Sequence, residues 1–371
     1  MQRIRLTFKA LWLAGFFPLI VNKHSLNAVK KGVRLQKYDG IPYVELSYIA
    51  TRPNNFAIRA LNKITGYVNE FFFLFKRRKQ IKAAILYTPL FSELFYYRIL
   101  SKIWGFKLVI QYVEYRSAID NRQTFFKILN DRLFDGYCHK FCDGVLAISE
   151  FLKDHIESKG SKTKVLKAPV ICDFNEFSYS GTPVSNQPYL MYCGTINYLE
   201  VIEFLLDLFI ELKNEGIYNG NFLMVISGDN KPVWDQFRAR IAQNPYASSI
   251  EVLSNIKYSE LVDRYIKSDV LVIPLRRTIQ DIARFPHKIG EYTASGRPIL
   301  STKLGELDHY FDDNSAILAD EYTVESYKQK MKSTLANRDL STIGKNGYDI
   351  GQKKFHYASV AAEIGNFIEN L

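Results

Sequence analysis

The stretch Ile282-Ala-Arg-Phe-Pro-His-Lys-Ile-Gly-Glu-Tyr-Thr-Ala-Ser-Gly-Arg-Pro298 indicates the fold class of this 371-residue chain. An apolar run precedes it at residues 269–274, and another follows at residues 298–302. Such runs are typical of parallel strands that are buried on both faces of a sheet. Between them, Pro286 suits a first helical turn, apolar residues recur at helical spacing, and Gly296 ends the helix. We therefore expect a strand–helix–strand unit.

Charged residues cluster at the start of this predicted helix. Helices in such units point their N-termini at the carboxyl edge of the sheet, where open α/β sheets bind ligands. Arg284 and Lys288 lie there beside backbone N–H groups, which is suitable chemistry for binding a diphosphate. Glu291 follows Lys288 by one turn and is placed to accept hydrogen bonds from the hydroxyls of a ribose. The alternative is a solvated ion pair between Lys288 and Glu291 at i, i+3 spacing.

The same stretch resembles the signature of a known enzyme family. Phe285-Pro-His-Lys288, Glu291-Tyr, Ala294-Ser-Gly296 and Pro298 are similar to the sugar-nucleotide signature of family 4 of the retaining glycosyltransferases. The resemblance implies an α/β chain with the GT-B fold, in which two Rossmann-like domains face each other across a cleft. It also implies that Glu291 holds the ribose of a nucleotide-diphosphate sugar.

One position departs from that signature. The family carries two glutamates separated by seven residues, and Glu291 matches only the second of them. Ala283 stands at the position of the first glutamate, which in the family contacts the transferred sugar. Asp281 is the nearest carboxylate, and we expect it to be the substitute.

Two glycine-ended apolar runs predict phosphate-binding turns in the second half of the chain. The run from Tyr189 reads as a strand that ends at Gly194, with Thr195 in the turn that follows, and residues 222–229 repeat the design with Gly228. A glycine at such a turn lets the backbone approach a phosphate closely. The basic pair that the family places after the first glycine is absent, so Arg284 and Lys288 are expected to bind the phosphates.

A carboxylate in the first half is a third candidate. The run at 107–112 reads as a parallel strand, and Glu114 follows its carboxyl end, in the ligand crevice of such a sheet. We expect Glu114 to contact the sugar or the acceptor. A glutamate that only caps the strand is the competing interpretation.

The same patterns divide the chain into two domains, 1–180 and 181–371. Ser149 reads as the N-cap of a helix after a strand, an arrangement similar to the end of the family's first domain. The Gly-, Pro- and Ser-rich residues 181–188 read as the hinge. Residues 3–13 resemble the end of the family's first helix, so its opening strand is expected to be missing, as in a chain truncated at its N-terminus. Residues 16–21 read as a strand, and 33–47 as a hairpin whose Pro42 marks an edge strand.

Composition restricts the partners. Residues 1–180 hold 29 Lys and Arg against 14 Asp and Glu, whereas the remainder holds 20 against 24. This asymmetry admits nucleic acid or an anionic membrane as partner of the first half. Within the first half, Phe71-Phe-Phe-Leu-Phe-Lys-Arg-Arg-Lys-Gln80 combines rings with consecutive charges, as in helices that lie on anionic lipid. An ordinary core helix with a basic end is the alternative. We expect the membrane, and no nucleic acid, to be the partner.

Two further features bear on localisation and metals. Residues 11–21 are apolar but too few to span a bilayer. The four cysteines form no disulfide framework, and Cys138 and Cys142 read as buried thiols rather than zinc ligands. The expected location is the cytoplasm, with peripheral contact at the inner face of the cell membrane. The expected chemistry requires no metal and no cofactor.

The sequence therefore predicts a retaining, hexosyltransferase-type glycosyltransferase of cell-surface polysaccharide synthesis. A nucleotide-diphosphate sugar would be its donor, and a lipid-linked or saccharide molecule its acceptor. Arg284 and Lys288 would neutralise the leaving diphosphate. The alternative is a relative with this fold that binds a sugar nucleotide or a partner without catalysis, which Ala283 and the missing basic pair favour.

Overall fold

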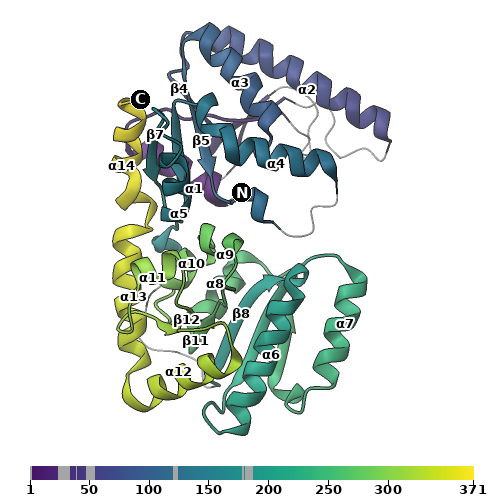
Figure 1. The fold of residues 1–371 in the computed structure, drawn as a ribbon, viewed down its shortest axis with the longest axis vertical. Helices are drawn as coiled ribbons and strands as arrows, with labels where there is room; N and C mark the ends of the chain where they lie inside the picture. The colour runs from purple at the N-terminus through teal and green to yellow at the C-terminus, as the bar shows by residue number, and fades with distance from the viewer. Residues whose placement is uncertain are drawn as a thin grey trace.

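A computed structural model describes residues 2–23, 34–38, 40–46, 55–119, 124–177, 179 and 187–371. The described chain forms two α/β halves stacked along the long axis of the molecule (Figure 1). The N-terminal half holds the first seven strands, and the C-terminal half holds a separate parallel sheet. The predicted α/β class and GT-B architecture are consistent with this arrangement. The boundary predicted at residues 180 and 181 lies outside the described residues and stays a prediction.

The N-terminal half opens with a helix and a small sheet. Helix α1 (Gln2–Leu13) matches the predicted helix, whereas β1 (Ile20–Asn22) is shorter than the strand predicted at 16–21. The predicted hairpin is present as β2 (Arg34–Tyr38) and β3 (Ile41–Glu45), which pair antiparallel. The edge position predicted from Pro42 is wrong for the strand, because β3 lies between β1 and β2. The pairing with β1 starts only at Tyr43, so no ladder hydrogen bond to β1 is needed at Pro42.

A four-stranded parallel sheet forms the body of this half. Its order is β4-β5-β6-β7, and its strands are β4 (Ala83–Leu86), β5 (Lys107–Tyr112), β6 (Gly144–Ala147) and β7 (Lys164–Lys167). Its helices are α2 (Phe56–Arg77), α3 (Phe91–Trp104), α4 (Phe125–Tyr137) and α5 (Glu150–Glu157), with the 3-10 turns η1 (Arg116–Ala118) and η2 (Cys138–Phe141). Ser149 caps α5 as predicted, because its side chain accepts a hydrogen bond from the Leu152 N–H.

The C-terminal half is built on a six-stranded parallel sheet of order β10-β9-β8-β11-β12-β13. Its strands are β8 (Tyr189–Thr195), β9 (Asn221–Ser227), β10 (Ile250–Leu253), β11 (Val270–Val272), β12 (Ile299–Thr302) and β13 (Ile317–Ala319). Its helices are α6 (Leu199–Asn214), α7 (Lys231–Ala242), α8 (Tyr258–Lys267), α9 (Ile279–Ala283), α10 (Lys288–Ala294), α11 (Glu306–Tyr310), α12 (Val324–Asn337), α13 (Leu340–Lys354) and α14 (Tyr357–Glu369). Short turns are η3 (Phe174–Glu176), η4 (Ile196–Tyr198) and η5 (Ala247–Ser249).

The last helix returns to the first half. In Figure 1, α14 runs along the side of the molecule and reaches the N-terminal sheet. Leu6 and Leu11 of α1 pack in one buried cluster with Val360 and Ile364 of α14. A Cβ added at Gly365 would meet the Cβ of Ala14, the residue after α1, at 2.7 Å. Only glycine allows the two segments to approach this closely.

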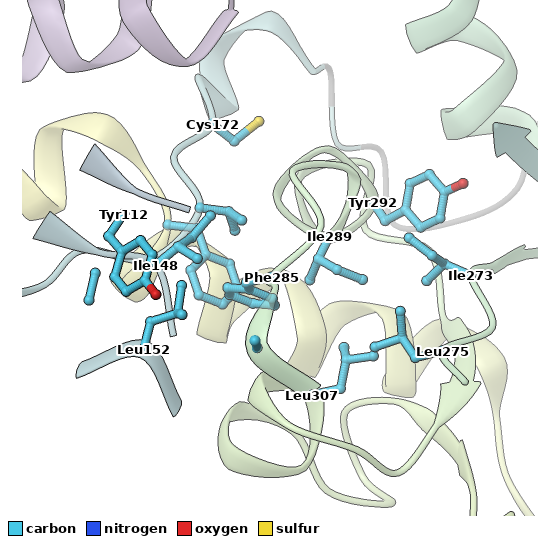
Figure 2. Close-up of a cluster of buried hydrophobic side chains, with 14 of the residues drawn as sticks. Tyr112, Ile148, Leu152, Cys172, Ile273, Leu275, Phe285, Ile289, Tyr292 and Leu307 are labelled. Atoms are coloured by element: carbon cyan, nitrogen blue, oxygen red, sulfur yellow. The ribbon is translucent and has the colours of Figure 1, made fainter. Parts of the chain in front are cut away.

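A hydrophobic cluster crosses the interface between the halves (Figure 2). Ile148 and Leu152 come from the N-terminal half, and Phe285 and Ile289 come from the C-terminal half. Phe285 is 2% exposed, stacks on Tyr310 at 5.6 Å between ring centroids, and meets a second ring edge-on. The phenylalanine of the deciding stretch is therefore an anchor between the halves, which positions the residues on either side of it.

Candidate functional site

The predicted phosphate-binding glycines lie side by side at the carboxyl edge of the six-stranded sheet. Thr195 of β8 pairs with Ser227 of β9, and the Ser227 hydroxyl donates to the Gly194 carbonyl at 3.1 Å. Gly228 has φ +119°, a conformation that favours glycine, and a Cβ there would approach Ile196 Cγ2 to 2.8 Å. The structure thus brings Gly194, Thr195 and Gly228 together at one edge of the sheet.

Helix α10 places Glu291 beside two tyrosines of α8. The hydroxyls of Tyr258 and Tyr265 donate to Glu291 Oε1 and Oε2, each at 3.4 Å. Burial raises the pKa of Glu291, and Lys288 and the two tyrosines oppose that shift. Long hydrogen bonds to neutral donors leave the carboxylate able to accept others. Sequence reasoning missed both tyrosines, although their spacing of seven residues places them on one face of α8.

Lys288 lies near the same edge of the sheet, and its ammonium group makes no direct polar contact with the described residues. Among the described residues it has no hydrogen bond and no ion pair, so the alternative of a Lys288–Glu291 pair at i, i+3 spacing does not hold in this structure. It is near enough to Cys193 of β8 to oppose the rise in pKa that burial gives this thiol. The Cys193 N–H in turn donates to the Tyr292 hydroxyl at 3.2 Å. The ammonium of Lys288 thus lies close to Cys193 of β8 and to Glu291, and acts on both through its charge without a direct ion pair.

His287 precedes Lys288 and faces the N-terminal half. Its ring is exposed to solvent, but desolvation by the surrounding chain lowers its pKa, and so do the charges of Arg3 and Lys288. The ring is therefore neutral at pH 7. The contribution expected from backbone N–H groups at the start of α10, which begins two residues after Pro286, stays a prediction. The positive side chains of Lys288 and Arg284 are what favours the binding of an anion here.

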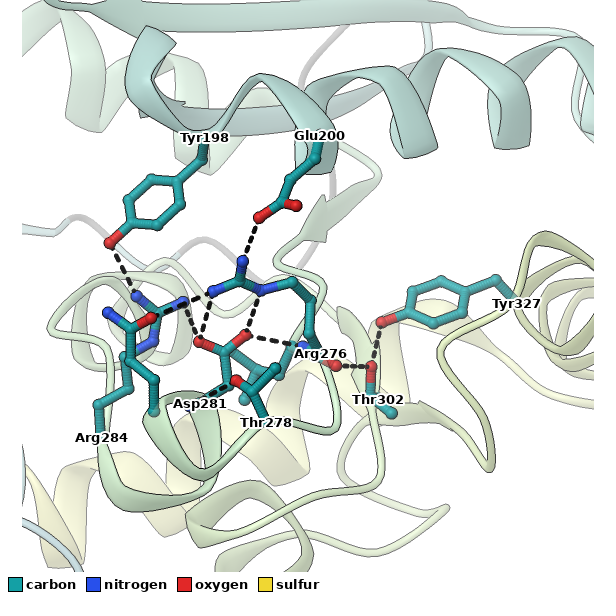
Figure 3. A network of polar contacts seen from close by, with 10 residues as sticks. Tyr198, Glu200, Arg276, Thr278, Asp281, Arg284, Thr302 and Tyr327 are labelled. Atoms are coloured by element: carbon teal, nitrogen blue, oxygen red, sulfur yellow. Dashed lines mark hydrogen bonds and ion pairs between the residues drawn. The ribbon is translucent and has the colours of Figure 1, made fainter. Parts of the chain in front are cut away.

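Arg284 belongs to a buried ion network (Figure 3). Its Nη2 pairs with Asp281 Oδ1 at 2.8 Å, and its Nη1 donates to the Tyr198 hydroxyl at 3.1 Å. Asp281 also accepts from the backbone N–H of Arg276 at 2.8 Å and from Arg276 Nε at 3.0 Å, while Arg276 pairs with Glu200. The structure thus fixes Arg284 between a carboxylate and a tyrosine at the end of β8.

This network corrects the role expected for Asp281. Its side chain is fully buried and saturated by two arginines, so it cannot reach a sugar in place of the glutamate missing at Ala283. Ala283 itself is buried, and its carbonyl accepts a hydrogen bond from the Ser149 hydroxyl at 2.5 Å. The position of the family's first glutamate is therefore used here for contact between the two halves. The i, i+3 spacing of Asp281 and Arg284 was the signal that could have revealed their pairing.

Glu114 lies apart from the other predicted residues, on the N-terminal half. It follows β5, and its Oε2 is 3.7 Å from Arg116 Nη1, while Arg116 also pairs with Asp131 at 3.1 Å. The neighbouring turn η1 contacts α9, so Glu114 is at the side of the interface that faces the C-terminal half. A role in contacting sugar or acceptor stays a prediction.

A second ion network across the interface was not predicted. Glu306 of α11 is 3% exposed; its Oε1 accepts from the Glu150 N–H at 2.7 Å, and its Oε2 lies 3.3 Å from Lys167 Nζ. Lys167 also pairs with Glu150 at 3.1 Å. An open cavity of about 400 Å³ adjoins this network, lined by Glu150, Phe151, Ile282, Gly305, Glu306, Asp308 and His309. These contacts hold α5 of one half against α11 of the other.

The predicted buried thiols are buried. Cys138 and Cys142 are free cysteines in and after η2, and burial raises the pKa of both. Within the described ranges no group of three or more His, Cys, Asp or Glu side chains could hold a metal ion.

Comparison with known proteins finds a family model that matches most of the second half of the chain. Residues 173–349 match the family model described as Glycosyl transferases group 1. This segment contains the deciding stretch, both glycine turns, Arg284, Lys288 and Glu291. Comparison with curated proteins gave no match.

Solved structures resemble the whole chain. Sucrose-phosphate synthase from Thermosynechococcus elongatus is 15% identical, with a TM-score of 0.76, over 99% of this chain and 92% of that one. A glycosyltransferase from Rickettsia africae is 14% identical, with a TM-score of 0.69, over 99% and 94%. HepE from Anabaena in complex with UDP is 12% identical, with a TM-score of 0.66, over 90% and 87%.

At such identities the structures establish the fold, and the family model establishes the class of enzyme. The predictions of a GT-B fold and of a glycosyltransferase are confirmed. The chain is a glycosyltransferase of the GT-B fold, and its residues 173–349 match the family model of the group 1 glycosyl transferases.

Proposed function

We propose that the protein transfers a sugar, with retention of anomeric configuration, from a nucleotide-diphosphate donor to a lipid-linked or saccharide acceptor in cell-surface polysaccharide synthesis. One observation carries the donor site: within the group 1 domain, Lys288 and Glu291 lie one turn apart near the end of β8 without pairing. A free ammonium and an accessible carboxylate suit a diphosphate and a ribose, respectively. Gly194, Thr195 and Gly228 lie at the same sheet edge.

The positive charges at this sheet edge suit the diphosphate that leaves when the donor bond breaks. The bond between the anomeric carbon and the diphosphate oxygen breaks, and its electron pair goes to the diphosphate. The acceptor's hydroxyl oxygen bonds to the anomeric carbon, and its proton passes to the leaving group. Negative charge therefore grows on the diphosphate, where Lys288 and Arg284 stabilise it. Asp281 and Tyr198 hold the Arg284 guanidinium in place, which spares the cost of ordering it during the reaction.

The first experiment is calorimetric titration with UDP, because HepE was solved with UDP and with UDP-glucose. We expect the wild type to bind and Glu291→Ala to lose most of its affinity. Glu260→Ala removes an exposed carboxylate of α8 and is the matched control. Unchanged affinity in Glu291→Ala would remove Glu291 from the site. Binding without transfer to any saccharide or lipid-linked acceptor would favour the non-catalytic alternative.

We further propose that the N-terminal half works at an anionic membrane surface. Helix α2 exposes an apolar row at helical spacing along its length, here called the α2 stripe: Ile58, Leu61, Ile64, Val68, Phe72 and Phe75. Leu61 is 62% exposed and Ile64 is 59% exposed. The basic residues Lys76–Lys79 follow directly, so apolar insertion and attraction to anionic headgroups would act at one place. Within the described residues no helix is both long enough and apolar enough to cross a membrane.

The neighbouring helices support the choice of lipid over protein or nucleic acid. Phe71 and Phe75 of α2 pack on Trp104 of α3, and α3 exposes its own apolar row at Phe95, Ile99 and Ile103. The acidic side chains of α2, α3 and α4 are all buried, namely Glu70, Glu93, Asp131 and Asp135. The outward charge of these three helices is therefore entirely positive. A surface that is both apolar and purely cationic is complementary to anionic lipid rather than to nucleic acid, which needs no such apolar rows.

Liposome co-sedimentation tests whether the protein binds an anionic membrane. The intact protein should sediment with vesicles that contain phosphatidylglycerol, remain soluble with phosphatidylcholine alone, and be released by salt. Changing Lys76, Arg77, Arg78 and Lys79 to Gln should abolish sedimentation. The matched control removes four charges from the C-terminal half, at Lys231, Lys303, Lys332 and Lys345, and should sediment like the wild type. Equal recovery of the wild type in the soluble fraction with both lipids would overturn the proposal.

A further inference from the structure

The guanidinium of Arg3 is buried without a counter-ion. Arg3 is 9% exposed; its Nε donates to Gln111 Oε1 at 2.8 Å, and its Nη2 donates to the Ala168 carbonyl at 3.3 Å. Its Nη1 is buried and has no hydrogen-bond partner. Among the described residues no carboxylate pairs with it. By contrast, Arg5 and Lys9 of the same helix are paired, with Glu176 and Asp173.

An unpaired buried cation is costly for a folded protein. Two neutral acceptors satisfy part of the guanidinium, but its charge is left without an opposite one. Burial lowers the pKa of Arg3 to about 10, so the group is still cationic at pH 7. Perturbed charged groups cluster at functional sites, where a ligand can supply the missing opposite charge. Arg3 therefore marks a place where an anion is expected.

The position of Arg3 identifies the anion. Gln111 is near the carboxyl end of β5, and Ala168 follows the carboxyl end of β7, so Arg3 lies at the ligand-binding edge of the N-terminal sheet. On the opposite side, Arg3 is close enough to His287 for its positive charge to lower the pKa of the His287 ring. The preceding residue, Gln2, donates to the Tyr258 hydroxyl at 3.3 Å, and this hydroxyl donates to Glu291.

We infer that Arg3 is a binding residue for the diphosphate of the donor, supplied from the N-terminal half to a site whose other charged groups, Lys288 and Arg284, come from the C-terminal half. The inference rests on the proposed function, because it takes the diphosphate to lie between His287 and the end of β8. Arg3 then contributes a cation from α1 to this diphosphate site. Donor binding would draw the two halves together through this residue.

Thermal unfolding with and without UDP tests the inference. In wild type, UDP should raise the melting temperature, because it binds the folded state. In Arg3→Gln, the ligand-free protein should melt at the same temperature or higher, since an uncompensated charge is removed, and the UDP-induced rise should largely vanish. Its affinity for UDP should fall about tenfold or more, as expected for hydrogen bonds to a charged group. Affinity for uridine, which has no phosphates, should be unchanged.

The control variant is Arg5→Gln on the same helix. It breaks the pair with Glu176, so it should lower the melting temperature of the ligand-free protein and leave the UDP-induced rise intact. Arg3→Lys, which keeps the charge, should recover part of the UDP response. A destabilised Arg3→Gln variant with the full UDP-induced rise would overturn the inference and make Arg3 structural. A wild type that shows no response to UDP or other nucleoside diphosphates would instead overturn the proposed donor site.

Discussion

The two halves differ in how completely they bury their large apolar side chains. Of the large hydrophobic side chains that are exposed in the described chain, only Tyr258 and Ile279 belong to residues 187–371. The N-terminal half exposes whole rows of them on α2 and α3, and it also carries the excess of positive charge. Since exposed apolar patches mark interaction sites, this difference supports the proposal that the C-terminal half binds the donor and the N-terminal half approaches the acceptor at a partner surface.

The largest effect is expected at Lys288, which would tie the chemistry to the C-terminal half. Lys288→Ala and Arg284→Ala should each lower turnover by about a hundredfold or more, with a smaller change in donor KM, because the charge they meet grows toward the transition state. Steady-state kinetics with saturating acceptor measures both constants. Lys303→Ala, at an exposed lysine after β12, serves as control. A change confined to KM would mean that the two residues only bind the donor.

The next effect tests how firmly the halves are joined. Glu306→Ala removes the buried partner of Lys167 and of the Glu150 N–H, so it should lower the free energy of unfolding by about 3 kcal/mol. Urea denaturation measures this loss. Asp235→Ala, which breaks the exposed pair with Arg238, should change the free energy by no more than about 0.5 kcal/mol. Equal losses in the two variants would show that the interface network contributes nothing particular.

A smaller effect concerns the α2 stripe. Leu61→Ser with Val68→Ser should weaken binding to phosphatidylglycerol vesicles by about tenfold or more, given about 1.5 kcal/mol for burying each side chain. The melting temperature should stay unchanged, because both side chains are already exposed in the folded protein. Ile279→Ser, an exposed apolar position of the other half, should not affect sedimentation. A lower melting temperature with unaltered vesicle binding would make the stripe part of a protein contact instead.

The smallest effect is a pH dependence of donor binding. Burial raises the pKa of Glu291, and its carboxylate must be ionised to accept hydrogen bonds from both ribose hydroxyls. Affinity for UDP should therefore increase as pH rises through a pKa above the ordinary glutamate value, and fall below it. Calorimetry between about pH 5 and about pH 8 covers this window. Glu291→Gln should remove the dependence along with most of the affinity; a slope that survives must come from another group.

The sequence was informative where structure is local. An apolar run predicted β5 with its observed bounds, and the run ending at Gly194 predicted β8 one residue short of its end at Thr195. The GT-B fold was implied by the resemblance to family 4 of the retaining glycosyltransferases. Parallel pairing of adjacent strands also placed Gly194 beside Gly228, because neighbouring parallel strands end at one sheet edge. Such inferences depend on the periodicity of apolar residues and on the direction of the chain, and both can be read from a single sequence.

The side-chain partners within the site were not predictable in the same way. Tyr258 joins Gln2 to Glu291 across more than 250 residues of sequence, and the contact between Ser149 and Ala283 depends on how the halves meet. The edge position expected for β3 was wrong because β1 returns to cover it, a tertiary contact that Pro42 does not encode. Likewise, Asp281 looked available until the structure placed Arg276 against it.

The packing of α14 on α1 affects the order in which the chain can fold during synthesis. Val360, Ile364 and Ile368 complete the cluster around Leu6 and Leu11, and Leu371 lies against β6, where a Cβ at Gly144 would meet it at 2.8 Å. The half that the ribosome makes first therefore lacks part of its core until the last helix has emerged. The six-stranded sheet, whose strands are contiguous in sequence, can form before that. The N-terminal half is thus made first and completed last, and its core stays open throughout that interval.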